Sequence, residues 1–183
     1  MGDSAKRVRA QSKICGRLNL IFVTVGNDFR AFDRLLKKMD EIAPSLPEKV
    51  LVQKGYSTYC PKHTEYFDFV PMNLATEYLL KSRLVVSHAG IGTIILCKQH
   101  GIPLLILPRR KKHEEHMNDH QLEVAQALEK RKDGNIHVLY EEDRLREKVL
   151  EILGEKGRGR TVEDMGRLNL IHAVREFLQT TLR

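Results

Sequence analysis

Short apolar runs alternate with helical periodicity along most of the chain. Runs rich in Val, Ile, Leu and Phe predict strands at 20–25, 50–52, 67–70, 84–87, 104–107 and 136–139. After the first run and again after the last, apolar residues recur every three or four positions, which predicts helices beginning near Phe29 and Leu145. Parallel strands need crossover connections, and unbroken apolar strands need cover on both faces. The order therefore predicts an α/β fold, a parallel sheet with helices on both faces.

The 183 residues favour one folded domain. We expect this domain to span 18–153, between a basic tail at 1–17 and a last segment at 154–183. That segment begins as a linker rich in glycine and charge. The sequence TVED at 161–164 resembles a capping box, which predicts a final helix with an apolar stripe. Packing on the chain's own sheet, or on a partner subunit, would each explain such a stripe.

Composition narrows the class of protein. Hydrophobic residues make up 42% of the chain and charged residues 30%, and the apolar runs are far shorter than the ~20 residues that span a bilayer. Without a signal peptide, and with three widely spaced cysteines, the chain is expected in the reducing cytoplasm. A net charge of +7 favours anionic partners. The basic run at 109–112 fits a solvated loop as well as an anion site, and without interleaved aromatic residues it does not predict nucleic-acid binding.

The clearest chemical feature follows the run at 84–87, in the sequence SHAGIGT. Ligands of open parallel sheets bind at the carboxyl ends of strands, where helix N-termini present backbone amides. Gly90 and Gly92 would let the backbone approach a ligand, and Thr93 offers a hydroxyl at the start of the next helix. His88 could donate to a phosphate oxygen, more strongly if protonated. The turn suits a diphosphate, although a Gly-x-Gly pair also occurs for steric reasons alone.

Other motifs fit the chain less well. It has no Gly-Lys-Ser/Thr of a P-loop and no Gly-x-Ser-x-Gly of a serine hydrolase. A dinucleotide fingerprint would place three spaced glycines after the first strand, where only Gly26 occurs. His113, His116 and His120 lack the spacing of a zinc protease motif and have no cysteine nearby, so no metal is expected.

SHAGIGT, followed by GIPLLILP and HMNDHQLEVAQAL, resembles the nucleotide-sugar half of family 28 glycosyltransferases over about 20–153. More closely, the chain resembles the small catalytic subunits that add N-acetylglucosamine to polyprenyl-diphosphate glycans, and their bacterial exopolysaccharide relatives. The resemblance implies the Rossmann-like, C-terminal half of a GT-B fold. It also implies transfer of N-acetylglucosamine or a similar sugar from a UDP-sugar to a lipid-linked acceptor, with inversion and no cofactor. A membrane-anchored subunit would hold the acceptor and bring the chain to the membrane.

The resemblance also assigns candidate site residues by position. The paired phosphates of the UDP-sugar would be held by the glycine turn, with His88 stabilising the leaving UDP. The full set for the diphosphate is His88, Gly90, Gly92 and Thr93; for the sugar Asn118, His120 and Gln121; for the uracil Phe69 and Met72; for the cleft wall Gly26 and Asn27; and in the basic run Arg109.

Two roles are less clearly assigned. Relatives commonly bind the ribose through a glutamate on the helix after the glycines, where this chain has Leu96 at one aligned position and Gln99 at the other. Gln99 could hydrogen-bond a hydroxyl, but without a charge. Asp28 is a candidate for the catalytic base, and capping of the next helix would explain it equally well.

Three other interpretations stay open. A non-catalytic module that binds a UDP-sugar or a partner would share the glycine turn. The related UDP-sugar 2-epimerases share the fold, but they carry both halves in one longer chain. A nucleic-acid binder would use the basic tail and the run at 109–112, and its affinity would fall steeply with salt.

Overall fold

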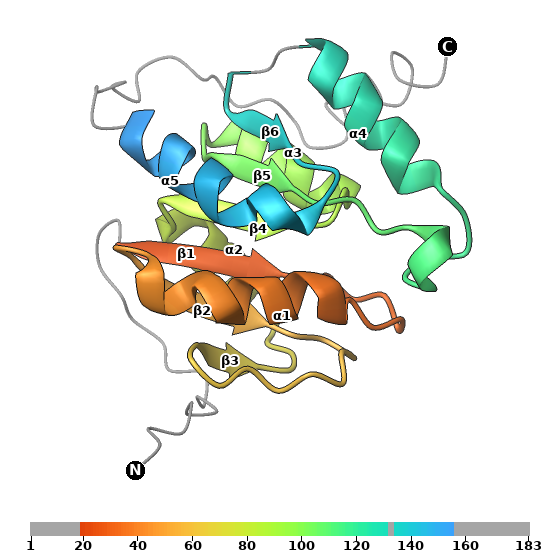
Figure 1. Ribbon diagram of the computed structural model, residues 1–183. Coiled ribbons are helices and arrows are strands. Elements are labelled where there is room, and N and C mark those ends of the chain that lie inside the picture. Colours follow the sequence, from red (N-terminus) through yellow and green to blue (C-terminus); the bar gives the residue numbers. More distant parts are fainter. Residues whose placement is uncertain (1–18, 132–133, 156–183) are drawn as a thin grey trace.

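The computed structural model describes residues 19–131 and 134–155, so the tail at 1–17 and the helix expected after Thr161 lie outside the described residues. Within them, one sheet of parallel strands has the order β3-β2-β1-β4-β5-β6 (Figure 1). The strands are β1 (Leu20–Thr24), β2 (Lys49–Gln53), β3 (Glu65–Phe67), β4 (Leu84–Ser87), β5 (Leu104–Ile106) and β6 (Ile136–Val138). Each apolar run thus forms a strand, and only the third is displaced, toward the N-terminus of its run.

Helices cover both faces of the sheet, which confirms the α/β prediction. They are α1 (Asp33–Ile42), α2 (Met72–Lys81), α3 (Ile91–Gln99), α4 (His120–Arg131) and α5 (Leu145–Glu155), with short 3₁₀ turns η1 (Ala43–Ser45), η2 (Lys111–His113) and η3 (Glu142–Arg144). In Figure 1, α1 and α5 lie on one face, and α2, α3 and α4 lie on the other. The sheet is therefore the middle layer of three.

Two apolar cores follow from the alternation of side chains along each strand. In β1, Ile21 and Val23 face the core that contains α1 and α5, whereas Leu20 and Phe22 face the core under α2, α3 and α4. The same division holds in β4 and β5. Burial on both faces explains why these strands are nearly continuous runs of apolar residues.

The strand order places a crevice between β1 and β4. From β1 the chain builds outward through β2 and β3, then returns to the other side of β1 and continues through β4, β5 and β6. Connections leave the adjacent ends of β1 and β4 in opposite directions, and such a reversal opens a crevice at the carboxyl edge. Because Thr24 is paired with Ser87, the segments after these two residues lie next to each other at that edge.

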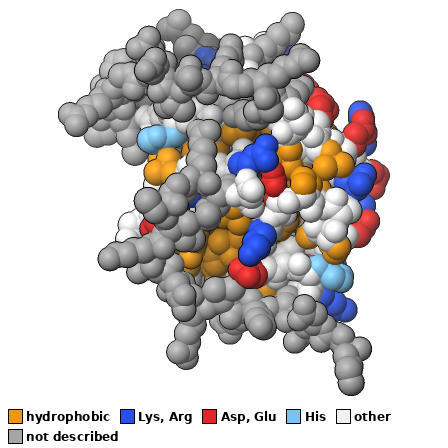
Figure 2. All heavy atoms as spheres, turned by 90° about the vertical axis from the view of Figure 1, so that its left-hand side faces the viewer, with side chains coloured by type: hydrophobic (Ala, Val, Ile, Leu, Met, Phe, Trp, Pro, Cys, Tyr) orange, Lys and Arg blue, Asp and Glu red, His pale blue; other side chains and the backbone are white. Residues whose placement is uncertain are grey.

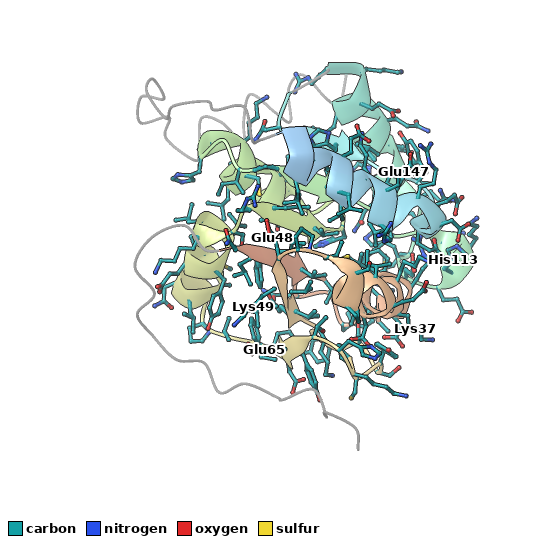
Figure 3. The ribbon with its side chains drawn as sticks, turned by 60° about the vertical axis from the view of Figure 1, so that its left-hand side comes forward. Lys37, Glu48, Lys49, Glu65, His113 and Glu147 are labelled. Atoms are coloured by element: carbon teal, nitrogen blue, oxygen red, sulfur yellow. The ribbon has the colours of Figure 1, made fainter. Side chains whose placement is uncertain are left out.

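The opposite edge, where the strands begin, is closed by polar contacts. Glu48, buried just before β2, forms an ion pair with Arg83, which also donates to the carbonyl of Leu153 at 3.3 Å. Figure 2 shows this edge, on which basic, acidic and hydrophobic side chains are intermixed. In Figure 3, Glu48 and Lys49 lie on this side, and His113 lies where the strands end. Across the described ranges, no helix has the length and apolar character needed to cross a membrane.

Helix α1 begins four residues later than the periodicity predicts, at Asp33. Phe29 is 70% exposed. The backbone between them is bound elsewhere, because the amide of Phe32 donates to Ser57 Oγ at 2.9 Å and the carbonyl of Arg30 accepts from a distant arginine. These residues form a loop at the carboxyl edge of the sheet instead of a first helical turn.

Candidate functional site

The imidazole of His88 lies between two glycines, one from each side of the crevice. A Cβ atom on Gly26, after β1, would lie 2.5 Å from His88 Cε1, and one on Gly90 would lie 2.5 Å from His88 Nε2. Real Cβ atoms essentially never come this close to another heavy atom, so any larger residue at either position would displace the ring. The two glycines are needed for the packing of His88, a role that the sequence does not reveal.

Backbone conformation separates these two glycines. Gly26 has φ of 73°, in the left-handed region that glycine adopts readily, and its amide donates to Thr24 Oγ1 at 3.2 Å. Gly90 is the N-cap of α3 with φ of −82° and ψ of 124°, which any residue can adopt. Gly90 is therefore required by its contact with His88 alone, whereas Gly26 is required by both its contact and its conformation.

Gly92 has a different environment. Among the described residues, a Cβ atom on Gly92 would have no heavy atom within 4 Å apart from its neighbours in the helix, and the residue is exposed in the first turn of α3. The first amides of a helix have no acceptor within the helix and carry the positive end of its dipole. The space in front of Gly92 is thus open to an anion. Thr93, the next residue in α3, is partly buried.

His88 is neutral at physiological pH. Burial, followed by the positive charge of Arg109, lowers the pKa of His88 to about 4. Its Nδ1 lies 3.2 Å from Ser87 Oγ, which itself donates to the carbonyl of Thr24 at 2.9 Å. Because the hydroxyl proton of Ser87 is used in that bond, we assign the proton of the neutral ring to Nδ1, and Nε2 is then an acceptor. Ser87 is a site residue that the sequence did not single out.

Gln121 ties the glycine turn to the loop that follows β5. Its Oε1 accepts from the amide of Ala89 at 3.3 Å and from the amide of Arg109 at 3.0 Å. The residue is 8% exposed, at the start of α4. Gln121 therefore lies next to the glycine turn, and its carbonyl oxygen is engaged with the protein.

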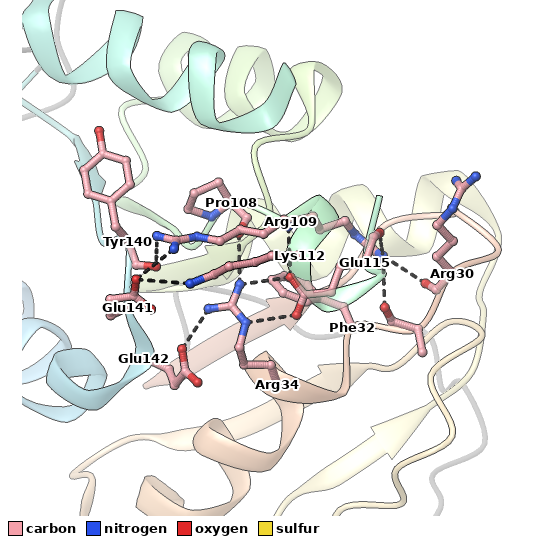
Figure 4. Close-up of polar contacts among 12 residues, drawn as sticks. Arg30, Phe32, Arg34, Pro108, Arg109, Lys112, Glu115, Tyr140, Glu141 and Glu142 are labelled. Carbon is pink, nitrogen blue, oxygen red and sulfur yellow. Dashed lines mark hydrogen bonds and ion pairs between the residues drawn. The ribbon is translucent and has the colours of Figure 1, made fainter. Parts of the chain in front are cut away.

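Arg109 was predicted to bind substrate, but its side chain is 0% exposed. The guanidinium donates to the carbonyls of Val25, Arg30 and Glu115 at 2.9, 2.9 and 3.0 Å. Its central carbon lies 4.9 Å from the ring centre of Phe32 (Figure 4). This burial argues against direct contact with a substrate. Arg109 instead joins the β1–α1 loop to the β5–α4 loop beneath the site.

Asp28 forms a turn and does not cap α1, whose N-cap is Phe32 without a side-chain bond. Asp28 Oδ1 accepts from the amide of Arg30 at 2.9 Å, and the same carboxylate forms an ion pair with the Arg30 guanidinium at 3.3 Å. Burial raises the pKa of Asp28, but the Arg30 amide and the charges of Arg109, Arg30 and His116 outweigh burial and hold it below its usual value. A carboxylate stabilised in this way is a weak base.

The residues expected around the uracil lie on an exposed part of the carboxyl edge of the sheet. Phe69 is 43% exposed and Met72 is 68% exposed. The ring of Phe69 meets that of Tyr56 edge-on, with 4.8 Å between centres. Gly55, with φ of 55°, leaves room for the backbone of Gly26. Tyr56 was not among the predicted residues, because a single tyrosine in a loop gives no sequence signal.

The remaining predicted residues divide into two groups. Asn27, Asn118 and His120 are exposed at the carboxyl edge, the first two in loops and His120 at the start of α4. Asn118 Oδ1 accepts from the amide of His120 at 3.2 Å. His120 Nδ1 lies 3.1 Å from Glu123 Oε2. Gln99 is the last residue of α3, about 12 Å along the helix from Ile91 at 1.5 Å per residue, so the structure does not bring it to the glycine turn.

Leu96, at the other position aligned with the ribose-binding glutamate of relatives, packs against the core beneath α3. Within the described residues, no group of three or more His, Cys, Asp or Glu side chains is arranged to hold a metal ion. The histidines at 113, 116 and 120 are spread along the β5–α4 loop and the start of α4, where His116 Nδ1 lies 2.9 Å from Asn118 Oδ1.

Comparison with known proteins identifies a family. The model of the glycosyltransferase family 28 C-terminal domain matches residues 20–177. The UDP-N-acetylglucosamine transferase subunit ALG13 of Cryptococcus neoformans is 47% identical over 75 residues, which is 40% of this chain and 34% of that protein. The human protein of the same name is 32% identical over 126 residues, 62% of this chain and 10% of that protein. The matches thus span 34% and 10% of the lengths of these relatives.

Solved structures share the fold. A glycosyltransferase of kitacinnamycin has a TM-score of 0.56 and 18% identity, over 97% of this chain and 44% of that chain. MurG of Acinetobacter baumannii has a TM-score of 0.53 and 13% identity, over 77% of this chain and 42% of that chain. At such low identity the likeness shows the fold alone: a Rossmann-like sheet corresponding to less than half of each of these proteins.

Proposed function

The chain belongs to glycosyltransferase family 28, and from this membership we propose that it is the donor-binding subunit of a UDP-N-acetylglucosamine transferase. The crevice between β1 and β4 binds UDP-N-acetylglucosamine or a similar UDP-sugar. The sugar is transferred with inversion to a lipid-linked acceptor, which a membrane-anchored partner subunit holds. The chain works at the cytosolic face of the membrane, which it reaches through that partner, without a cofactor or metal.

One observation carries the proposal: an open space in front of the first turn of α3, at the point where the strand order reverses. Gly92 adds no side chain to this space, and the helix dipole favours negative charge there. A diphosphate bound at this position would accept hydrogen bonds from the amides at the start of α3. The names of the relatives, UDP-N-acetylglucosamine transferase subunits, support the choice of donor.

In this proposal the protein stabilises the leaving UDP. Negative charge grows on the diphosphate as the glycosidic bond breaks, and amides already oriented toward it need no reorganisation. His88 Nε2 is an acceptor in the neutral ring, so donation to a phosphate oxygen requires a second proton, which a nearby diphosphate would favour. His88 therefore takes up a proton when the donor binds.

The base that removes the acceptor proton is assigned to the partner subunit in this proposal. Asp28 was the candidate within this chain, but its ion pair with Arg30 and its lowered pKa make it a poor proton acceptor. An acceptor-binding subunit would bring the base together with the hydroxyl that it activates.

Thermal unfolding with UDP tests donor binding. We expect UDP, but not phosphate, to raise the melting temperature, and His88→Ala to abolish the rise. His100→Ala is the matched control, because His100 is exposed at the other end of α3. Equal responses to UDP and phosphate would contradict the proposal. Incubation with UDP-N-acetylglucosamine and membranes, with and without candidate partner chains, then tests transfer, which we expect only when a partner is present.

A further inference from the structure

The loop between β5 and α4 is held in place by a buried carboxylate. Glu115 is 4% exposed, and its carboxylate accepts hydrogen bonds from Arg34 Nε at 2.9 Å and from Arg34 Nη2 at 3.0 Å (Figure 4). Its Oε2 also accepts from the amide of Arg110 at 3.0 Å. A bidentate pair of this kind fixes direction as well as distance. The loop is thereby bound to the first turn of α1.

Arg34 is shared between two carboxylates. Its Nη1 lies 2.8 Å from Glu142 Oε2 in η3, and its Nη2 also donates to the carbonyl of Pro108 at 3.0 Å. The side chain of Arg34 is only 10% exposed. Burial lowers the pKa of Arg34, but the bonds to Glu115 and Glu142 outweigh burial and raise it. The guanidinium therefore stays charged, and its hydrogen bonds hold it in one position.

The backbone next to Glu115 is strained. Glu114 has φ of 58°, and among the described residues it is the one non-glycine residue with positive φ. Such a conformation is unfavourable for a residue with a side chain and persists where surrounding contacts enforce it. Here it lets the chain turn so that Glu115 faces Arg34, while the carbonyl of Glu115 accepts from Arg109. The contacts of Glu115 outweigh the cost.

Three residues beyond Glu115, the same loop carries Asn118, and α4 begins with His120 and Gln121. These are the residues expected to contact the sugar. The diphosphate turn lies between β4 and α3, and within the described residues neither Arg34 nor Glu115 forms a hydrogen bond to it. Gln121 links this turn to the loop through its bonds to the amides of Ala89 and Arg109, whereas the side chains of Arg34 and Glu115 hold only the loop.

We propose that Arg34 and Glu115 form a positioning pair, which fixes the sugar-facing residues of the β5–α4 loop relative to the diphosphate turn. This inference rests on the proposed function. It gives a distinctive expectation: loss of the pair weakens binding of the sugar nucleotide more than binding of UDP itself. A pair that only stabilised the fold would change both affinities equally, or neither.

The test compares dissociation constants for UDP and UDP-N-acetylglucosamine, measured by calorimetry on the full chain well below its melting temperature. In Glu115→Gln we expect the dissociation constant of UDP-N-acetylglucosamine to rise about tenfold, which corresponds to the loss of one good contact. The dissociation constant of UDP should change less than about twofold. Arg34→Lys keeps the charge but loses the bidentate geometry, so the same change is expected, and it serves if Glu115→Gln does not fold.

Glu142→Gln is the matched control, because it removes a carboxylate from the same guanidinium and Glu142 lies in η3, outside the loop. It should leave the ratio of the two constants unchanged. An unchanged ratio in both Glu115→Gln and Arg34→Lys would overturn the positioning role while leaving donor binding intact. A wild-type chain that binds neither compound would overturn the proposed function and this inference with it.

Discussion

Replacing Gly92 by valine separates ligand binding from folding. In the part of the chain that the structure describes, a Cβ atom at this position meets no atom within 4 Å beyond its own helical turn, so the valine side chain projects into the space proposed for the diphosphate. Valine is a better helix former than glycine by about 0.3–0.5 kcal/mol. For a chain of this size that corresponds to a rise in melting temperature of at most about 2 °C. The unliganded variant should therefore be as stable as the wild type.

The effect of ligand sets the expected signal. At 100 times its dissociation constant, a ligand stabilises the folded state by about 2.7 kcal/mol. This free energy corresponds to a rise in melting temperature of roughly 5–11 °C. We expect UDP to produce this rise in the wild type and none in Gly92→Val, as followed by thermal unfolding with and without UDP.

Gly154→Val provides the control. Gly154 also lies in a helix, is exposed and, among residues 19–131 and 134–155, has no heavy atom within 4 Å of an added Cβ beyond its own helical turn, but it is near the C-terminal end of α5. It should keep the full response to UDP. If Gly92→Val keeps that response as well, the diphosphate does not lie in front of α3 and the proposed site is refuted.

Two further predictions concern His88. Gly90→Ala would place a methyl group 2.5 Å from His88 Nε2, so we expect it to displace the ring. Chemical denaturation should then show a free energy of unfolding lower by about 1–3 kcal/mol, and UDP should bind more weakly. Unchanged stability would contradict the packing of His88 against Gly90. The pKa of His88 is about 4 in the folded chain, below its ordinary value of 6.5. The unfolded chain therefore binds a proton on His88 more readily than the folded chain does. The free energy of unfolding is thus unaffected by this group above pH 6.5 and decreases, by about 3 kcal/mol in all, as the pH falls through 4. In denaturation curves between these pH values, His88→Gln should show a correspondingly weaker pH dependence, and an identical pH dependence would contradict the burial of the ring.

Much of the fold could be predicted from the sequence, because its main determinants are local. The apolar runs mark strands that are buried on both faces, and the turn signal SHAGIGT lies directly after one of them. The start of α1 was harder to predict. Phe29 continues the helical spacing, but the carbonyl of Arg30 is bound by Arg109, a residue 79 positions away in sequence. Periodicity contains no information about such a distant hydrogen bond.

The role of Arg109 was hidden for a related reason. It opens a run of four basic residues, which suggests a solvated loop or an anion site. In the structure its three neighbours in the run are partly or fully exposed, and Arg109 alone is completely buried. A buried guanidinium needs several acceptors, and here backbone carbonyls from two loops supply them. Carbonyls are present at every residue, so their convergence on one side chain leaves no trace in composition or spacing.

The same reasoning explains why the two glycines of the turn, Gly90 and Gly92, have different roles. In a one-dimensional motif, Gly90 and Gly92 look equivalent. In three dimensions Gly90 accommodates a protein side chain, His88, and Gly92 faces open space at the start of α3. A glycine kept small by the protein itself must remain small for folding, whereas one that faces open space need be small only for a ligand. The absence of a protein contact at Gly92, next to a tightly packed Gly90, is therefore the strongest physical reason to place the ligand at this turn.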